Sequence, residues 1–398
     1  MKMFGVDLDP TRLSDSPTYP TNCANGTTCY VSFATVGEAP NRSFVVTWNN
    51  VPEWINYTRT AGNFNIQAIL QENGEFVFQY GSNVHGGTGT GEVGWEIDTG
   101  DYDVLRFPGG SEPDPNTAVK FSYPEPIAEY RMEQPDWSAY PVRDTSGHGR
   151  HGTAVGIGGA TPPTTTAAGK VCRGGSIVDN NSVAQISAID SGINVPTDVG
   201  SVGTATFWVY GVSQDRMLFD ASTILNAAAS PVTGAWFYAM RTTNGAVRFV
   251  VSDEAGTRYV AETANNMIAA GSWAHVAITW NFNAKTGANQ DRIRVWVNGV
   301  LRTTNAFTTA SPLASAISTL YIGDNRNTNA IDTNANGGTG RSAGTTLDEF
   351  RLYNVEAGLG LVLRDMNQAG ACLGHYAVVH GGSGTTCAPT QVTIRAHD

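Results

Sequence analysis

Hydrophobic and polar positions alternate over short stretches in the first third of the chain. Residues 64–70 (FNIQAIL) and 76–80 (FVFQY) follow this period of two, and Asn73–Gly74 lies between them. Strand side chains alternate between two faces, and an Asn-Gly pair is typical of a hairpin turn. Residues 43–48 predict another strand, which we expect to end in a turn at Asn49–Asn50. This region therefore predicts β-structure.

The second part of the chain also predicts strands, with one short helix. Its clearest strands are residues 204–210, 273–280 and 292–297, and Asn298–Gly299 predicts a turn into the next strand. We expect the helix at residues 356–368, where apolar side chains fall loosely on one side. The predicted fold class is therefore all-β, with two β-sandwich domains in tandem.

The length of the chain, 398 residues, exceeds that of one ordinary sandwich. We place the first domain at residues 1–122 and the second at residues 127–372. Residues 123–136 contain several prolines, which cannot serve a central strand, so we predict a linker there. Residues 373–398 predict the incomplete start of a third domain.

The charge of the chain narrows the choice of partners. Acidic residues exceed basic ones by 35 to 24, which gives a net charge of −11. This balance disfavours nucleic acid and anionic membranes, since both require a basic surface. No apolar run is long enough to span a bilayer. The first residues also lack the apolar segment of a signal peptide, so we interpret the sequence as a fragment of a longer secreted protein.

The five cysteines are typical of an extracellular protein. Cys23 and Cys29 enclose a short polar loop, a spacing that suits a disulfide across a small hairpin. Cys172 and Cys372 flank most of the second domain, and we expect a second disulfide there, while Cys387 is left over. The sequence has no Cys-x-x-Cys pair and no Cys/His cluster, so it indicates neither zinc binding nor thiol redox chemistry.

Four motifs of the second domain resemble those of a known fold. Residues 144–152 (DTSGHGRHG) are similar to the opening motif of laminin-G-like, concanavalin-type jelly rolls. Residues 271–277 (GSWAHVA), 297–299 (VNG) and 347–354 (LDEFRLYN) resemble later motifs of the same domains, in the same order. The resemblance implies a jelly-roll sandwich for the second domain.

The flanking regions extend this resemblance. Residues 48–52 (WNNVP), 71–74 (QENG) and 78–81 (FQYG) are similar to the nidogen-like sandwich of surface proteins. Residues 375–389 are similar to the start of the domain that closes MshQ-type proteins. As a whole, the chain resembles the MshQ-type proteins of MSHA-like type IV pilus systems. The resemblance implies an exported, pilus-associated protein at a Gram-negative cell surface, with a role in adhesion or assembly and no catalytic residues.

Two groups of residues look catalytic but do not complete a catalytic pattern. The segments around His151 and Asp190 resemble those of subtilisin-like proteases, but their order is reversed and no matching serine turn follows. Glu96 and Asp98 begin a Glu-x-Asp-x-x-Glu glycosidase pattern, but residue 101 is aspartate and the pattern lies in the first domain. We therefore expect that the protein is not an enzyme.

Calcium is the candidate cofactor. Asp332, Asn334 and Asn336 precede Gly337 in the spacing of a calcium-binding loop, where alternate oxygen ligands converge on a hard cation. Asp324 and Asp348 supply further oxygens if the loop folds back on the closing strand. The glutamate expected at the end of such a loop is missing. A solvated, asparagine-rich loop therefore stays open as the other interpretation.

Aromatic residues divide into candidate sugar contacts and candidate core residues. Those in loop-like or linker segments, which are suited to stacking on a sugar, are Trp54, Tyr57, Trp137 and Tyr140. Those within predicted strands, which we assign to the core, are Trp208, Trp280 and Trp296. His275 shares a strand face with Trp273, and we expect it to be packed rather than to bind a ligand.

Three functional hypotheses follow. The first is a pilus-associated adhesin or structural surface protein that acts by binding, with pilus components or surface glycans and proteins as partners. The second is a calcium-dependent, lectin-like glycan-binding module. The third is an accessory region of a larger secreted hydrolase.

Overall fold

The computed structural model divides into two compact units, Met1–Tyr123 and Pro124–Asp398. It describes residues 8, 29–39, 41–51, 64–82, 92–98, 101–106, 113–179, 185–212, 215–223, 234–283, 291–307, 311–326, 344–368, 375–379 and 393–397. Among these residues, no helix combines the length and the apolar character that crossing a membrane requires.

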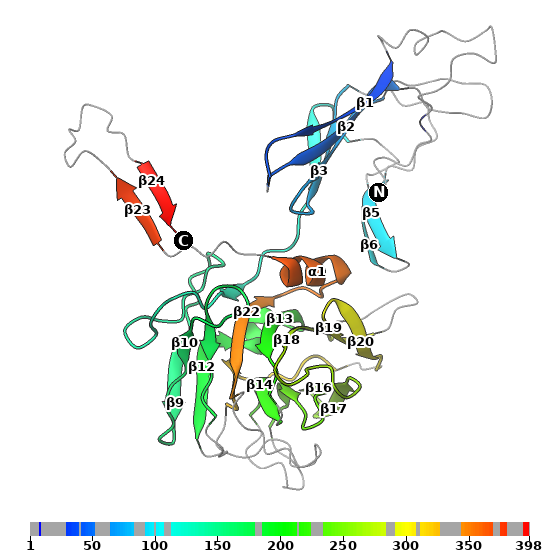
Figure 1. The fold of residues 1–398 in the computed structure, drawn as a ribbon. Helices are drawn as coiled ribbons and strands as arrows, with labels where there is room; N and C mark the ends of the chain where they lie inside the picture. The colour runs from blue at the N-terminus through cyan, green and yellow to red at the C-terminus, as the bar shows by residue number, and fades with distance from the viewer. Residues whose placement is uncertain are drawn as a thin grey trace. The chain divides into compact units, whose positions relative to one another are not determined.

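The first unit contains an antiparallel sheet with the strand order β1-β2-β3-β4-β7. Strands β1, β2 and β3 are labelled in Figure 1. Its strands are β1 (Tyr30–Val36), β2 (Ser43–Val51), β3 (Phe64–Gln71), β4 (Phe76–Tyr80) and β7 (Thr117–Phe121). A separate antiparallel pair is formed by β5 (Glu92–Asp98) and β6 (Asp101–Arg106). The β3–β4 hairpin predicted from the Asn-Gly turn is confirmed, with Leu70 opposite Phe76.

One turn prediction in this unit was wrong. The strand that begins at Ser43 does not end at Asn49–Asn50 but continues to Val51. The register against β3 shifts between Trp48 and Val51, and Asn50 has a φ of 51°. Asparagine tolerates this left-handed conformation, so the residue that suggested a turn forms a bulge within the strand instead.

Alternation in the middle strands of this sheet separates a core face from an open face. Phe64, Ile66 and Ala68 of β3 are buried, and the residues between them are half-buried. Phe78 and Tyr80 of β4 join them in one apolar cluster. Strands with one solvated face show this pattern, which is why the sequence predicted them.

The second unit is built from two antiparallel sheets. The eight-stranded sheet contains β8 (Ala128–Tyr130), β10 (Thr164–Thr166), β11 (Gly174–Ser176), β13 (Val202–Tyr210), β18 (Trp273–Asn281), β19 (Ile293–Val297), β20 (Val300–Asn305) and β22 (Thr346–Tyr353). The seven-stranded sheet contains β9 (Thr153–Ile157), β12 (Ile186–Asn194), β14 (Arg216–Asp220), β15 (Phe237–Arg241), β16 (Val247–Ser252), β17 (Arg258–Glu262) and β21 (Thr319–Ile322). The described part of the chain is therefore mostly β, as predicted.

Three further elements accompany these sheets. A π-helical turn, η2 (Val195–Val199), follows β12. The helix expected near the end of the second domain is confirmed as α1 (Leu359–Asn367). The pair β23 (His375–Val379) and β24 (Thr393–His397) forms a small antiparallel sheet of its own.

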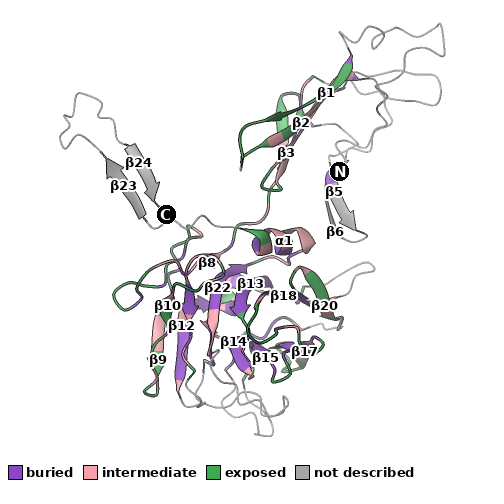
Figure 2. Cartoon of the chain, viewed as in Figure 1, coloured by how far each residue is buried: buried purple, intermediate pink, exposed green. Residues whose placement is uncertain are grey.

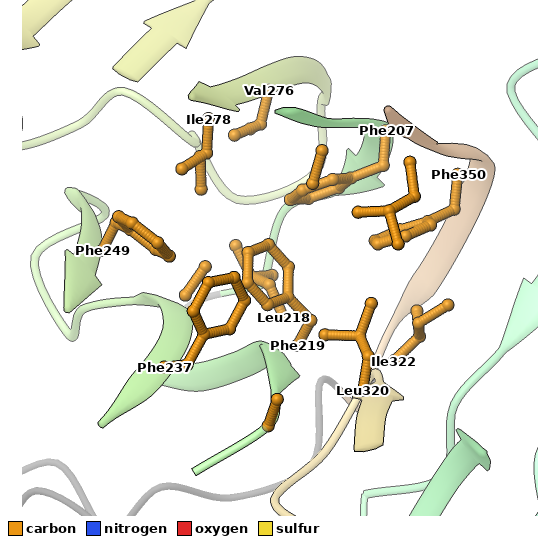
Figure 3. Close-up of a cluster of buried hydrophobic side chains, with 14 of the residues drawn as sticks. Phe207, Leu218, Phe219, Phe237, Phe249, Val276, Ile278, Leu320, Ile322 and Phe350 are labelled. Carbon is orange, nitrogen blue, oxygen red and sulfur yellow. The ribbon is translucent and has the colours of Figure 1, made fainter. Parts of the chain in front are cut away.

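The main core of the second unit lies between its two sheets. Phe207 and Phe350 come from the eight-stranded sheet, and Phe219, Phe237 and Phe249 come from the seven-stranded one (Figure 3). Strand β13 is buried along nearly its whole length (Figure 2). One of its faces meets this core, and Thr206 on its other face donates a hydrogen bond to Asp365 of α1. The strand is continuously buried because the core covers one of its faces and α1 lies against the other.

Strand β8 lies inside the segment predicted as a proline-containing linker. It pairs with β22, with Glu129 opposite Arg351. Tyr130 of β8 is fully buried, and its hydroxyl donates to the carbonyl oxygen of Arg150 at 2.8 Å. Residues 128–130 are thus part of the sandwich.

Candidate functional site

The loop after β8 is locked by one carboxylate. Asp144 Oδ1 accepts the backbone N–H groups of Glu129 and Ser146, both at 2.9 Å. Asp144 Oδ2 accepts the backbone N–H of Arg150 at 2.8 Å. Burial opposes the charge, but these hydrogen bonds outweigh it and lower the pKa of Asp144. The opening motif found in the sequence therefore fixes a tight loop, as expected from its side chains.

Asp324 of the predicted calcium set follows β21 and is buried. Its Oδ2 accepts the backbone N–H of Ser187, and its Oδ1 accepts that of Asn325, at 2.8 and 2.7 Å. Burial raises the pKa of Asp324 to about 8, and the nearby carboxylate of Asp220 adds to this effect.

Asp348 of the same set lies in β22, in the other sheet. Its Oδ2 accepts the backbone N–H groups of Lys170 and Val171 at 2.7 and 2.8 Å, and its Oδ1 accepts that of Glu349. Burial raises the pKa of Asp348 to about 8. Both described carboxylates are thus satisfied by backbone donors, and by themselves they do not fit one shared ion.

The remaining predicted ligands, Asp332, Asn334 and Asn336, lie outside the described residues. Within the described part of the chain, no three acidic, histidine or cysteine side chains are arranged to hold a metal ion. The calcium site therefore stays a prediction.

The cysteine predictions fall partly on described residues. Cys29 and Cys172 are disulfide-bonded. Cys23, Cys372 and Cys387 lie outside the described residues, so the expected pairs Cys23–Cys29 and Cys172–Cys372 stay predictions.

The aromatic candidates separate by exposure. Tyr140 is 67% exposed, whereas Trp137 is buried, with 6% of its surface exposed. A Cβ on Gly175 would lie 2.9 Å from the Trp137 ring, so the glycine admits this tryptophan to the core. Trp54 and Tyr57 lie outside the described residues. The core assignment is confirmed for Trp208, Trp280 and Trp296.

A groove that the sequence did not indicate crosses the sheet of the first unit. It has a volume of about 480 Å³ and spans β2, β3, β4 and the start of β7. The residues that line this groove, called the amide groove below, are Thr47, Trp48, Asn49, Asn65, Ile66, Gln67, Gln79, Tyr80, Gly81, Asn116, Thr117 and Ala118. Asparagine and glutamine are frequent in these strands, but periodicity alone does not distinguish a binding groove from an ordinary solvated face.

Two family models match different parts of the chain. Residues 187–357 match the concanavalin A-like lectin/glucanases superfamily, and residues 20–122 match a model described as NIDO related. The chain combines a NIDO-related domain with a concanavalin A-like domain. The first lies within Met1–Tyr123 and the second within Pro124–Asp398. No curated protein matches the chain significantly.

Solved structures resemble the chain at low sequence identity. Domain 4 of AbnA, a GH43 extracellular arabinanase from Geobacillus stearothermophilus in complex with arabinotriose, is 16% identical, with a TM-score of 0.41 over 62% of this chain and 100% of that one. The receptor-binding domain of botulinum neurotoxin D is 11% identical, with a TM-score of 0.38 over 60% of this chain and 51% of that one. The IT-sialidase CBM40 of Ruminococcus gnavus, bound to α2,3-sialyllactose, is 12% identical, with a TM-score of 0.32 over 46% and 97% of the two chains.

His275 of the concanavalin A-like domain is packed, as expected. It is buried on β18, and its ring meets that of Trp208 edge to face at 5.2 Å. Its backbone N–H donates to Asn298 Oδ1, whereas its Nδ1 has no hydrogen-bond partner among the described residues. Burial lowers the pKa of His275 to about 4. The folded domain therefore holds a neutral imidazole.

This histidine predicts an acid-dependent loss of stability. Between pH 6.5 and pH 4, the unfolded chain binds a proton at residue 275 that the folded domain does not bind, so the free energy of unfolding falls as the pH is lowered. The expected loss from this residue is about 3 kcal/mol at pH 4. Urea unfolding of the wild type and of His275→Gln at pH 7 and pH 4 measures this loss. Equal losses in the two proteins would contradict the prediction.

Proposed function

We propose that the chain is part of an exported, MshQ-type surface protein that acts in adhesion by binding its partners. The supporting observation is the succession of a NIDO-related domain and a concanavalin A-like domain in one chain. In this proposal, the partners are surface glycans and proteins together with components of a type IV pilus. The protein then lies outside the cell or on the surface of a Gram-negative bacterium.

Two side chains that looked catalytic have local structural roles. His151 Nδ1 accepts the backbone N–H of Asp144 at 3.0 Å. Asp190 Oδ1 accepts the backbone N–H of Gly192 at 3.0 Å. Both side chains stabilise local turns, a structural use that agrees with a protein that works through its surface.

Deletion of the gene in the bacterium that carries it tests this proposal. We expect the protein on the cell exterior, where antibody labels intact cells, and we expect the deletion strain to attach less well to glycan-coated surfaces. Re-expression of the full-length gene should restore attachment. Exclusively cytoplasmic protein, or attachment unchanged by the deletion, would contradict the proposal.

Two further measurements separate the alternatives. A calcium-dependent lectin predicts that EDTA lowers both glycan binding and the Tm of the purified chain. An unchanged melt, with no metal by elemental analysis, removes that hypothesis. The accessory-region hypothesis requires a catalytic domain in the complete gene, together with hydrolysis of a polysaccharide by the full-length protein.

A further inference from the structure

Two rows of side chains on the sheet of the NIDO-related domain flank the amide groove. In the first row, Gln67 of β3 lies opposite Thr47 of β2 and opposite Gln79 of β4. Residues directly opposite each other on antiparallel strands project from the same face. Asn49 and Asn65, each two residues away from a member of the first row, begin the second row on that face.

The groove therefore lies on the open face of the sheet. Ile66 and Tyr80, which alternate with the two rows, point to the opposite face and belong to the domain core. Their backbone forms the floor between the rows. Strands β3 and β4 each have a neighbour on both sides, so their backbone groups are used by the sheet. A ligand in this groove must therefore be recognised by side chains.

The polar groups that the lining offers are all uncharged. The lining supplies the carboxamides of Asn49, Asn65, Gln67, Gln79 and Asn116 and the hydroxyl of Thr47, whereas Thr117, opposite Tyr80, donates its hydroxyl to the carbonyl oxygen of Asp114. None of the twelve lining residues is aspartate, glutamate, lysine, arginine or histidine. Each carboxamide offers both donors and an acceptor. The groove thus matches an uncharged ligand whose groups donate and accept hydrogen bonds in turn.

Part of this lining is held in place before any ligand arrives. Asn65 Oδ1 accepts the backbone N–H of Asn50 at 3.0 Å, and its Nδ2 donates to the carbonyl oxygen of Ser82 at 2.7 Å. Gln67 Nε2 donates to Thr47 Oγ1 at 2.8 Å. The exposed carboxamide of Gln79 has no hydrogen-bond partner among the described residues. The side chains of Asn65 and Gln67 are thus already ordered, while that of Gln79 is open to a ligand. Ordering before binding lowers the loss of side-chain entropy when a ligand binds.

We propose that the amide groove binds an uncharged saccharide. Vicinal hydroxyl groups donate and accept hydrogen bonds, as the carboxamides do, whereas sialylated, sulfated or phosphorylated ligands call for cationic side chains that this lining lacks. An added peptide strand would need open backbone groups, which β3 and β4 do not offer. The volume of about 480 Å³ falls within the range of small-ligand pockets.

This inference goes beyond the proposed function, because it assigns a ligand site to the NIDO-related domain rather than to the concanavalin A-like one. The two proposals can fail separately. Attachment of cells through the concanavalin A-like domain alone would leave the surface role intact and remove the groove as its site.

The test uses the purified full chain on a glycan array that carries uncharged oligosaccharides beside their sialylated and sulfated forms. The uncharged oligosaccharide with the highest array signal is then titrated by calorimetry into wild type, Gln67→Ala/Gln79→Ala and the control Gln71→Ala. Gln71 is the same residue type at the far end of β3 and does not line the groove. The Tm of each variant checks folding.

We expect uncharged oligosaccharides to bind in preference to their charged forms. The double variant should weaken binding roughly tenfold or more, since each amide contributes hydrogen bonds, and Gln71→Ala should leave it unchanged. As a second variant, Gln79→Glu, which places a charge in the groove, should further disfavour the charged forms. Three results would overturn the proposal: no uncharged oligosaccharide bound, equal affinity in the wild type and the double variant, or binding confined to charged glycans.

Discussion

Replacement of Phe219 by alanine is expected to destabilise the concanavalin A-like domain by about 3–5 kcal/mol. Phe219 is fully buried at the centre of the contact between the two sheets (Figure 3). Its ring lies 6.1 Å from that of Phe207 and 6.0 Å from that of Phe237, measured between centroids. Removal of this ring leaves a cavity between two sheets that are each held by their own hydrogen bonds, so the surroundings cannot collapse to fill it.

The measurement is the Tm of the full chain by differential scanning calorimetry, followed in the transition of the concanavalin A-like domain. A loss of this size lowers the Tm by roughly 10 °C in a domain of this length. Phe219→Leu should cost much less, because it conserves most of the volume. The control Tyr140→Ala removes a ring that is 67% exposed and should leave the transition in place. Equal shifts for the buried and the exposed position would contradict the assignment of Phe219 to the core.

Replacement of Arg351 by alanine is also expected to destabilise the concanavalin A-like domain by about 3–5 kcal/mol, but for an electrostatic reason. Arg351 is buried in β22, where its Nε donates to Glu129 Oε1 at 2.7 Å and its Nη2 donates to Glu349 Oε2. Burial disfavours its charge, but the carboxylates of Glu349, Asp365 and Glu129 raise the pKa of Arg351. Without the guanidinium, the buried carboxylate of Glu349 keeps its ion pair with Arg131 and no other among the described residues.

The control for Arg351 is an exposed pair of the same chemistry. Arg42 forms an ion pair with Glu72 on the surface of the NIDO-related domain. Exposed pairs contribute little, so Arg42→Ala should leave the Tm of its domain unchanged. Arg351→Met, which fills the space without a charge, separates lost packing from lost charge. A shift for Arg351→Ala no larger than that for Arg42→Ala would show that the buried pair has no structural role.

Local patterns in the sequence were sufficient for much of the fold. The strands at residues 64–70 and 76–80, and the helix near residue 360, were predicted because each depends on a short period and a nearby turn. The bulge at Asn50 was missed because asparagine suits a turn and a bulge equally well. Val51 decides between the turn and the bulge, because it pairs with Phe64 across the sheet.

The burial and the hydrogen-bond partners of polar and aromatic side chains were harder to predict. Asp324 and Asp348 carry the oxygens of a cation site, but backbone donors distant in the sequence use them: Ser187 for the first, and Lys170 and Val171 for the second. Trp137 lies just after the predicted linker and was a candidate sugar contact, yet Gly175 admits it to the core. Such partners are brought together only when the sheets form.

By itself, the sequence determined most of the longer strands, the hairpin turn at Asn73–Gly74 and the presence of two β domains, because alternation along a strand is a property of neighbouring residues. Only the tertiary structure decided where the amide groove lies. That groove needs Thr47, Gln67 and Gln79 in one row, and strand pairing alone aligns residues that the chain keeps 12 or more positions apart. Register is set by the burial of the opposite face, so the core of the domain fixes the position of its exposed groove.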